Sequence, residues 1–520
     1  MKLTPVHTRR LETALRNGSV STRQLPGLSS APVPWVKQAE NVNRDAQAVM
    51  SSLDQVFAAF EVGDGATLSF HHHYRNGDRL INAVIAHATK RGLRGLTLAP
   101  SSLFPVHEPL VEAIKAGVVT SIVTDYVQGP VADAIAAGHL ATPLVLQSHG
   151  GRARAIEGGD LDIDVAFVGA SQVDYRGCAT GRSGSLACGP LGYAMVDAAY
   201  ARSRVIVAED VLSNNLPSRL VDIDGQFADA LLTGLKPGDP TGIVSGTTLV
   251  RERCQTSQIV ETVVKVIQVS GLMRDGFSFQ TGAGGFTLSA VPALGSVIQA
   301  AGVKGAFISG GITGAHVAIA EAGLVERIYD VQSFDLQAIS SSSKSTWHEA
   351  ISASKYANPF HSAPVVDDLS VMLLGAAEVD FQFNVNVLST ADGRLIGGPG
   401  GHPDAAEGAE FSLVVTTLTA GGYSKIVPEV QCVTTPGSSI DGVVTDQGVA
   451  LNETWQHLAP ELRRQGIAVV SLEELADRAW REASLSPSEP MTDGRLMAVV
   501  ENRHGGVLDA VFARSSAHAH

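Results

Sequence analysis

Short apolar runs rich in β-branched residues alternate along this chain with segments whose apolar positions recur at helical spacing. The runs fall at residues 96–100, 121–125, 164–169 and 204–210. They are mostly apolar throughout, which is typical of strands buried on both faces of a parallel sheet. Helical spacing with a terminal glycine marks residues 79–92 and 108–117. This alternation predicts an α/β fold of largely parallel sheets flanked by helices.

Three stretches of the first half reappear in the second half. The pairs are residues 90–103 with 300–313, 113–125 with 320–330, and 165–174 with 371–380. Val371 follows Val165 by 206 residues, and Gly323 follows Gly117 by the same distance. A shared offset of this length indicates one duplicated domain rather than a short solenoid repeat.

The 520 residues exceed what one hydrophobic core supports, which agrees with a duplication. We expect a polar N-terminal arm at residues 1–45, two similar α/β domains at 46–254 and 255–505, and a tail at 506–520. Hydrophobic residues make up 44% of the chain and charged residues 17%, values that exclude a disordered chain and suit a globular enzyme.

The charge balance and the cysteines narrow the function classes. The 38 basic and 52 acidic residues give a net charge of −14 with no basic stripe, which disfavours a nucleic-acid partner but not a small anion. The four cysteines lack metal-ligand spacing and indicate reduced thiols. No apolar run approaches the roughly 18 residues of a membrane span, so we expect a cytoplasmic protein.

Three adjacent histidines follow the first expected strand of the first copy. Neighbouring strand residues point to opposite faces and no carboxylate or cysteine completes a ligand set, so no metal site is predicted. We expect His71, His72 and Arg75 to bind a phosphate or carboxylate, because ligands of open α/β sheets lie beyond the carboxyl ends of the strands. Ordinary loop packing is the alternative.

Small residues follow matching strands in the two copies. Ser101 and Ser102 end one strand, and Gly310 and Gly311 end its counterpart. Backbone amides at such positions can face an anion or a thioester oxygen. A plain strand-to-helix turn is the alternative, but occurrence in both copies favours a binding site.

Two glycine pairs beside histidines, and one polar segment after a later strand, are further candidates. Each glycine pair suits either a ligand site or a tight turn, and the asparagines of the polar segment share one face of a strand. The candidate residues in these segments are His149, Gly150, Gly151, Glu378, Asn384, Asn386, Gly400, Gly401 and His402.

The stretch Asp275–Ala290 joins an alternating strand to an apolar helical pattern through Gly282, Gly284 and Gly285. Gln280 is the last polar side chain before the bend, and its amide donates hydrogen bonds but is no nucleophile. The glycines lack the spacing of a dinucleotide fingerprint, and neither a nucleophile elbow nor a Walker motif is present. We therefore expect the bend to bring backbone amides close to a ligand.

Eight segments in order resemble the citrate lyase α subunit family, the citrate CoA-transferase component of that enzyme. The segments are SFHHHYRNGD, LTLAPSSL, SHGGR, GFSFQTGAGGFTLS, DVQSFD, EVDFQFNVNVL, GGPGGHPD and TPGSSIDGVVTDQGVALN. The resemblance covers residues 50–500 or so. It implies two α/β domains of the CoA-transferase kind, in agreement with the duplication.

The resemblance also implies an activity and partners. The family exchanges acetate for citrate on an acetyl thioester, which is carried by an acyl-carrier γ subunit with a CoA-derived prosthetic group or by CoA. A β subunit, the lyase, then cleaves the citryl thioester, so an oligomeric complex is expected. No permanently bound cofactor is implied.

The mechanism implied differs from that of better-known CoA-transferases, which use a glutamate near a comparable bend as nucleophile. Here Gln280 takes that place, so the citrate carboxylate is expected to attack the thioester directly, through a ternary complex and a mixed anhydride without an acyl-enzyme. Gln280, Gly284 and Gly285 are then expected to stabilise the oxyanion. The cations expected to hold the other carboxylates of citrate are His71, His72, Arg75 and His402.

Three alternatives stay open at this point. Citramalate or another di- or tricarboxylate is an equally acceptable acceptor, because the sequence does not give the pocket size. A thioester hydrolase would need an ordered water and a base such as Glu378. A non-catalytic scaffold or a sugar-isomerase-like binder would keep the fold without the chemistry.

Overall fold

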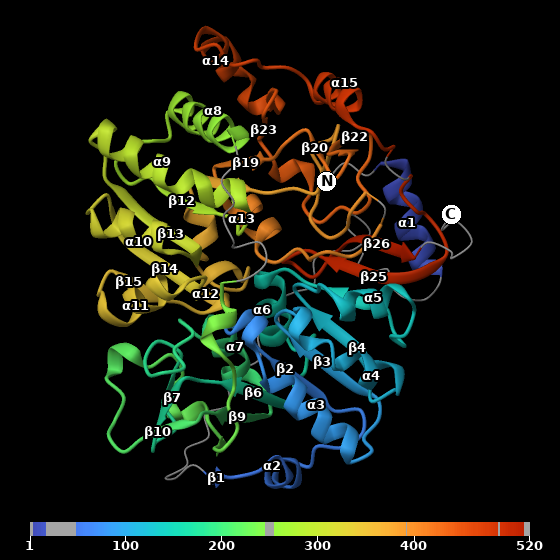
Figure 1. Cartoon of the computed structure of the whole chain (residues 1–520), viewed down its shortest axis with the longest axis vertical. Helices are drawn as coiled ribbons and strands as arrows, with labels where there is room; N and C mark the ends of the chain where they lie inside the picture. The colour runs from blue at the N-terminus through green and yellow to red at the C-terminus, as the bar shows by residue number, and fades with distance from the viewer. Residues whose placement is uncertain (1–3, 17–47, 245–253, 392, 487–488, 514–520) are drawn as a thin grey trace.

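The computed structural model describes residues 4–16, 48–244, 254–391, 393–486 and 489–513. Each half of the chain forms one large sheet with helices packed on it (Figure 1). Most of the predicted N-terminal arm, the segment 245–253 before the predicted domain boundary, and the last residues of the predicted tail lie outside the described residues.

The first sheet runs through the order β1-β11-β9-β6-β2-β3-β4-β5-β25-β26. Neighbours in it are parallel except for the antiparallel pair β25 and β26. Its strands are β1 (Ala48–Met50), β2 (Thr67–Phe70), β3 (Leu96–Pro100), β4 (Val119–Thr124), β5 (Leu144–Leu146), β6 (Val165–Gly169), β9 (Ser203–Val207), β11 (Ala230–Leu232), β25 (Arg495–Glu501) and β26 (Val507–Ala513).

The second sheet runs through the order β15-β14-β13-β12-β16-β19-β23-β24 and is parallel up to β23. Its strands are β12 (Ser278–Thr281), β13 (Gly305–Ile312), β14 (Val325–Ser333), β15 (His348–Ala350), β16 (Val371–Leu374), β19 (Phe411–Val415), β23 (Gly442–Thr445) and β24 (Gly448–Leu451). Short side sheets add β7 (Gln172–Asp174), β8 (Ala179–Thr180), β10 (Asp210–Leu212), β17 (Glu378–Asp380), β18 (Val385–Asn386), β20 (Thr419–Ala420), β21 (Tyr423–Ser424) and β22 (Ile426–Val427).

The helices alternate with the strands along the chain. They are α1 (Pro5–Arg16), α2 (Leu53–Ala59), α3 (Leu80–Lys90), α4 (Leu110–Lys115), α5 (Pro130–Ala136), α6 (His149–Gly158), α7 (Gly192–Tyr200), α8 (Cys254–Ser270), α9 (Gly285–Ala301), α10 (Gly314–Glu321), α11 (Leu336–Lys344), α12 (Ala353–Ala357), α13 (His402–Gly408), α14 (Ala459–Arg464) and α15 (Leu472–Glu482).

The predicted α/β fold and its duplication are confirmed by the strand order. The first sheet contains the order β5-β4-β3-β2-β6-β9-β11, and the second contains the order β15-β14-β13-β12-β16-β19-β23. Each strand of the first series has its counterpart at the same place in the second series. The repeated sequence pairs fall on matching strands, β3 with β13, β4 with β14, and β6 with β16. A repeated sequence has therefore folded into a repeated sheet.

The two ends of the described chain depart from the predicted boundaries. Residues 506–520 were expected to form a tail, but β26 occupies Val507–Ala513, and β25 pairs with β5 of the first sheet. The second-half segment thus closes the first sheet, because β5 otherwise offers unpaired backbone groups at its edge. In the arm, α1 packs on β26 and buries Arg10 against Asp509.

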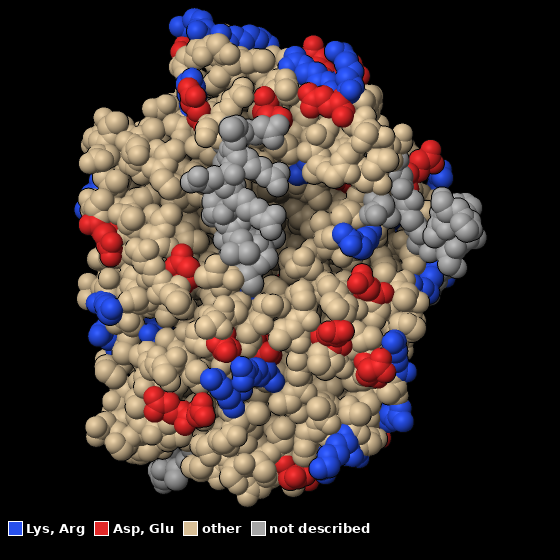
Figure 2. Space-filling model, viewed as in Figure 1, with Lys and Arg blue, Asp and Glu red and all other residues tan. Residues whose placement is uncertain are grey.

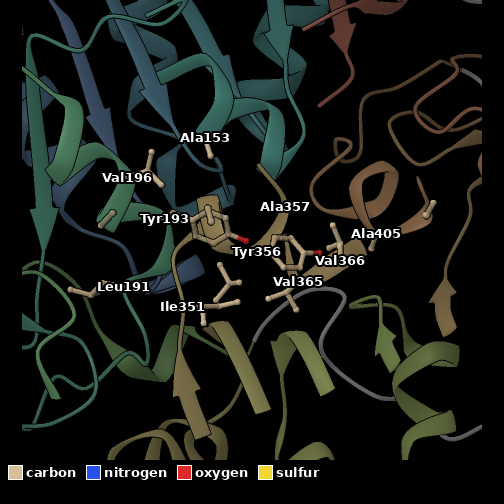
Figure 3. Packing of buried hydrophobic residues seen from close by; sticks show 14 of the residues in the cluster. Ala153, Leu191, Tyr193, Val196, Ile351, Tyr356, Ala357, Val365, Val366 and Ala405 are labelled. Atoms are coloured by element: carbon tan, nitrogen blue, oxygen red, sulfur yellow. The ribbon is translucent and has the colours of Figure 1, made fainter. Parts of the chain in front are cut away.

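The largest buried cluster belongs to both copies. Figure 3 shows Tyr193, carried by α7, beside Ile351 and Tyr356 of the second copy, and Val196 and Ala405 belong to the same cluster. A second buried cluster packs the first sheet against its helices, and a third does the same for the second sheet. The copies therefore share one apolar contact region, which holds their facing strand ends at fixed positions.

The exposed surface agrees with the charge pattern of the sequence. On the face shown in Figure 2, Lys and Arg alternate with Asp and Glu, and no broad basic patch gathers there. Among the helices of the described residues, none combines the length and the apolar content that a membrane span requires.

Candidate active site

A cavity of about 720 Å³ lies between the two copies. The first copy contributes mostly aromatic and basic side chains: His72, Arg75, Ser102, Phe104, Tyr126, His149 and Tyr193. The second copy contributes small and apolar residues, together with the polar or charged side chains Gln280, Thr281, Gln332, Tyr356, Arg394, His402, Tyr423, Ser424 and Lys425. A site at the facing strand ends of both sheets is where open α/β folds bind ligands.

Gln280 lies at the carboxyl end of β12 with its amide fixed at both ends. Ser309 Oγ donates to Gln280 Oε1 at 2.8 Å, and Gln280 Nε2 donates to the hydroxyl of Tyr356 at 2.7 Å. Gly310, with φ +94°, leaves space for this side chain, because a Cβ there would approach Gln280 Cδ to 2.6 Å. The amide is thus held in one orientation at the cavity wall.

The glycine bend after β12 forms the start of α9. Gly282 and Gly284 line the cavity, whereas Gly285 is not part of its wall. Thr287 Oγ1 donates to the carbonyls of Gly282 at 2.6 Å and Gly284 at 2.8 Å, which keeps the bend in shape. The first amides of a helix have no partner within the helix, so this end favours an anion.

His72 is held as a neutral ring. Ser101 Oγ accepts the backbone N–H of His72 at 3.0 Å and lies 2.6 Å from the ring nitrogen Nδ1. Burial, with His149 nearby, lowers the pKa of His72 well below its usual value. The side chain expected to be a cation at this position is therefore an uncharged imidazole.

Arg75 keeps its charge in the cavity. Its guanidinium lies over the rings of Phe104 and Phe334, at 4.9 and 5.2 Å from their centroids. Burial lowers the pKa of Arg75 to about 10, which still leaves it protonated at neutral pH. Gly311 makes room for Phe334, because a Cβ would lie 2.1 Å from that ring. A planar cation held between two rings suits a carboxylate.

His149 and the Gly400–Gly401 pair meet on one side of the cavity. His149 Nδ1 lies 2.7 Å from Asp125 Oδ2, and its backbone N–H donates to the carbonyl of Gly400. A Cβ on Gly401 would lie 2.7 Å from the Tyr356 hydroxyl and 3.1 Å from His149 Cδ2. The glycine pair therefore keeps the space between these side chains open.

His402 was expected to act as a cation, and the structure differs. Its Nε2 lies 2.9 Å from the Gly375 carbonyl and its Nδ1 lies 2.7 Å from Thr435 Oγ1. Burial lowers the pKa of His402 to about 4, so the ring is neutral with both nitrogens engaged. His402 is therefore an uncharged part of the cavity wall at neutral pH.

Four other predicted residues lie beside the cavity but do not line it. His71 turns away to Asp197, 2.7 Å distant, and Ser101 stands behind His72. In α6, the N–H of Gly151 donates to Ser148 Oγ at 3.0 Å. Gly150 packs on α12, because a Cβ there would lie 2.2 Å from the Ala357 carbonyl oxygen. Packing explains these glycines.

Glu378, Asn384 and Asn386 form a closed structural network outside the cavity. Asn386 Nδ2 donates to Glu378 Oε2 at 2.9 Å, and Asn384 Nδ2 donates to Asp380 Oδ2 at 3.0 Å. The matching loop of the first copy has the same turn, with Asp174 accepting two backbone N–H groups. These side chains hold the local backbone in shape, and none of the three lines the cavity.

Tyr356, Arg394 and Lys425 line the cavity although no sequence motif marks them. Tyr356 comes from the short helix α12, and Lys425 is partly buried with Nζ 2.5 Å from Thr416 Oγ1. Burial lowers the pKa of Lys425 to about 8. Their side chains reach the cavity through long-range packing, which local patterns do not encode.

The described residues of the cavity wall include three cations, Arg75, Arg394 and Lys425, but no aspartate, glutamate or cysteine. Cys178, Cys188 and Cys432 are free and buried elsewhere. Groups of side chains able to hold a metal ion are absent from the residues that the structure describes. The site thus offers positive charge and hydrogen-bond donors to an anionic ligand.

Two facing copies of one α/β unit around such a cavity define a protein of the CoA-transferase class, and known proteins support this. The family description "Citrate lyase, alpha subunit" matches residues 46–513. The chain is 40% identical over 474 residues to the citrate lyase alpha chain of Escherichia coli K12, covering 91% of this chain and 92% of that one. For the Klebsiella pneumoniae alpha chain the identity is 37%, with 93% and 94% covered.

A solved structure extends the comparison. A Streptococcus mutans protein, described as an alpha subunit of citrate lyase in complex with citrate, has a TM-score of 0.87 and 37% identity, covering 94% of this chain and 95% of that one. A malonate decarboxylase alpha subunit from Acinetobacter baumannii, with 11% identity and a TM-score of 0.62, shares the fold. The chain belongs to the citrate lyase alpha subunit family, as the sequence resemblance indicated, and is a transferase.

Proposed function

We propose that this protein is a citrate CoA-transferase, which exchanges acetate for citrate on an acetyl thioester and releases acetate. Its family relatives are citrate lyase alpha chains, and the similar Streptococcus mutans structure contains citrate. The cationic cavity between the two copies suits a tricarboxylate beside a thioester. The chain would act in a complex with an acyl-carrier subunit, whose CoA-derived arm bears the thioester, and with a lyase subunit.

The observation that carries the mechanism is the composition of the described cavity wall, which offers no carboxylate or thiol to accept an acyl group. The acceptor carboxylate therefore attacks the acetyl carbonyl carbon itself. A C–O bond forms, the C–S bond breaks, and the electron pair leaves with sulfur as a thiolate. The thiolate then attacks the citryl carbonyl of the mixed anhydride and displaces acetate.

Positioning and charge stabilisation supply the rate. Holding both reactants in line contributes about 7–11 kcal/mol, and each oxyanion donor contributes roughly 3–4 kcal/mol. Gln280 and the amides at the start of α9, around Gly284 and Gly285, lie at the second copy's strand end and suit the oxyanion. The anhydride hydrolyses in water, so the bound reactants have to exclude water from the cavity between the copies while the anhydride exists.

We assign the two ends of the cavity to different reactants. Arg75, with the imidazole rings of His72 and His149 near it, would hold the carboxylates of the acceptor acid. Arg394 and Lys425 would hold the phosphate groups of the thioester's carrier arm. The apolar wall, with Met372 and Leu374 among its residues, suits the uncharged part of that arm.

An exchange assay with acetyl-CoA and a panel of hydroxy-di- and tricarboxylates tests the function. We expect citryl-CoA and acetate to form in equal amounts, faster than products of citramalate. Release of acetate and free thiol without citryl-CoA would instead show a thioester hydrolase. The absence of any turnover would leave a binding protein without chemistry.

Borohydride treatment during turnover tests the absence of an acyl-enzyme. We expect no glutamate to be reduced, because Glu378 lies outside the cavity and Gln280 cannot form a thioester. A Glu378→Gln variant is the matched control and should exchange at the parental rate at pH 7.

The free thiols Cys178, Cys188 and Cys432 suit the reducing cytoplasm, where we place the reaction.

A further inference from the structure

Tyr356 reaches the cavity between the copies from α12, and only 2% of it is exposed. Figure 3 shows its ring close to that of Tyr193, with residues of both copies around them. Its hydroxyl oxygen accepts a hydrogen bond from Gln280 Nε2 at 2.7 Å. The same amide that the sequence marks as unusual is therefore in contact with this tyrosine.

The direction of this hydrogen bond fixes the tyrosine proton. Ser309 Oγ donates to Gln280 Oε1 at 2.8 Å, so the carbonyl side of the amide is occupied and the N–H side faces Tyr356. Because the tyrosine oxygen acts as the acceptor in this pair, its own O–H points elsewhere. Among the described residues, none accepts that proton. Burial raises the pKa of Tyr356 well above its usual value, so the proton stays in place at neutral pH.

Gly401 keeps the space next to this hydroxyl open. A Cβ at Gly401 would lie only 2.7 Å from the Tyr356 oxygen. The backbone of Gly401, with φ −89°, is one that any residue adopts, so its conformation does not demand glycine. The missing side chain leaves room for a ligand atom against the hydroxyl.

We propose that the Tyr356 hydroxyl is a catalytic hydrogen-bond donor to the oxyanion of acyl transfer, and that Gln280 positions it. This inference rests on the proposed transferase function and names a residue for it. When the acceptor carboxylate attacks, the carbonyl π electrons move to oxygen and Tyr356 donates a hydrogen bond to that oxygen without losing its proton. When the carbonyl re-forms, the C–S bond breaks.

The contact with Gln280 strengthens the donor. A hydroxyl that accepts a hydrogen bond becomes a better donor, because chains of hydrogen bonds polarise one another. Gln280 Nε2 carries a second N–H, which is available to the same oxyanion. A glutamate at position 280 would have to accept from Tyr356 and would turn its proton away from the ligand. The glutamine is thus suited to this arrangement.

The test compares two tyrosines of equal burial in the full-length protein. Tyr356→Phe removes the proposed donor and keeps the ring. Tyr74→Phe is the control, because Tyr74 is also 2% exposed but donates to the Leu186 carbonyl at 2.9 Å, outside the cavity. We expect Tyr356→Phe to lower kcat for acetyl exchange roughly 100-fold, with the KM for acetyl-CoA nearly unchanged. Tyr74→Phe should keep kcat.

A second variant guards against a folding failure of the first. Gly401→Ala keeps the Tyr356 hydroxyl but sets a methyl group against it, so the hydroxyl is blocked or displaced, and we expect a similar fall in kcat. Thermal unfolding and citrate binding, measured on each variant, report whether the fold persists.

The outcomes separate this inference from the proposed function. A Tyr356→Phe protein with the parental kcat would overturn the role of Tyr356 while the transferase function stands. An equal fall in Tyr356→Phe and Tyr74→Phe would assign Tyr356 a structural role and also overturn it. A parental protein without exchange activity would remove the proposed function itself.

Discussion

The central strand of each copy, β2 in the first and β12 in the second, ends in a different kind of loop. After β2 come three buried histidines and Arg75, whose side chains fill the strand end. β12 ends with Gln280 and Thr281 and runs into a glycine bend, which leaves the strand end open. At these two strand ends, the first copy places bulky side chains and the second copy places small residues and an amide.

The surrounding turns show that this difference is local. After β3 the N–H of Phe104 donates to His107 Nδ1 at 2.9 Å, and after β13 the N–H of Thr313 donates to His316 Nδ1 at 3.1 Å. The same histidine cap recurs at the same place in both copies. A duplicated frame can thus keep its turns while its two strand ends differ, and we propose that one end serves the acceptor acid and the other the thioester.

The largest expected effect belongs to the second copy. Gln280→Ala should lower kcat by more than 100-fold or so, because it removes an oxyanion donor and releases Tyr356, while the KM for acetyl-CoA changes little. In the double variant with Tyr356→Phe, the losses should combine to less than their product, since the two side chains act as a pair. Initial-rate kinetics measure both. A parental kcat would remove Gln280 from the mechanism.

The next effect belongs to the first copy. Arg75→Gln should raise the KM for citrate about 30-fold, the equivalent of roughly 2 kcal/mol for a lost charged hydrogen bond, and leave the KM for acetyl-CoA unchanged. Arg75→Lys keeps the charge without the planar fork and should recover part of the loss. If acetyl-CoA binding weakened instead, the assignment of the two cavity ends would be reversed.

The smallest expected effect is a pH dependence of acetyl-CoA binding, which Lys425 of the cavity wall would cause. Burial lowers the pKa of Lys425 to about 8, so Lys425 loses its charge as the pH rises through that value. The Kd for acetyl-CoA, measured by calorimetry from pH 7 to 9.5, should increase by about fivefold to tenfold. A Lys425→Arg variant stays charged and should give a flatter profile. Equal profiles for both proteins would exclude Lys425 from thioester binding.

Much of the fold follows from local sequence. Unbroken apolar runs become parallel strands, and the shared offset between halves predicts two sheets of one order. The position of β25 and β26 was not predicted: residues 506–520 were expected to form a tail, and the partner of β25, β5, lies in the other half of the chain. Sheet membership across such a distance depends on packing.

The site was predictable where a motif ends a strand. His72 and Arg75 follow β2, Gln280 lies at the end of β12, and all three line the cavity. Strand alternation also placed Asn384 and Asn386 on one face, but each amide is occupied by a carboxylate, Asn384 by Asp380 and Asn386 by Glu378. Tyr356 could not be predicted as a cavity residue, because the sequence of α12 has no distinguishing pattern. The tyrosine reaches the cavity because α12 packs on α6.

The pairing of β25 with β5 also sets an order of events on the ribosome. The first half leaves the exit tunnel early, yet its sheet keeps an uncovered border until the final strands have been translated. During that interval the border is a template for another nascent polypeptide. Premature termination of translation before residue 495 would make that vulnerability permanent.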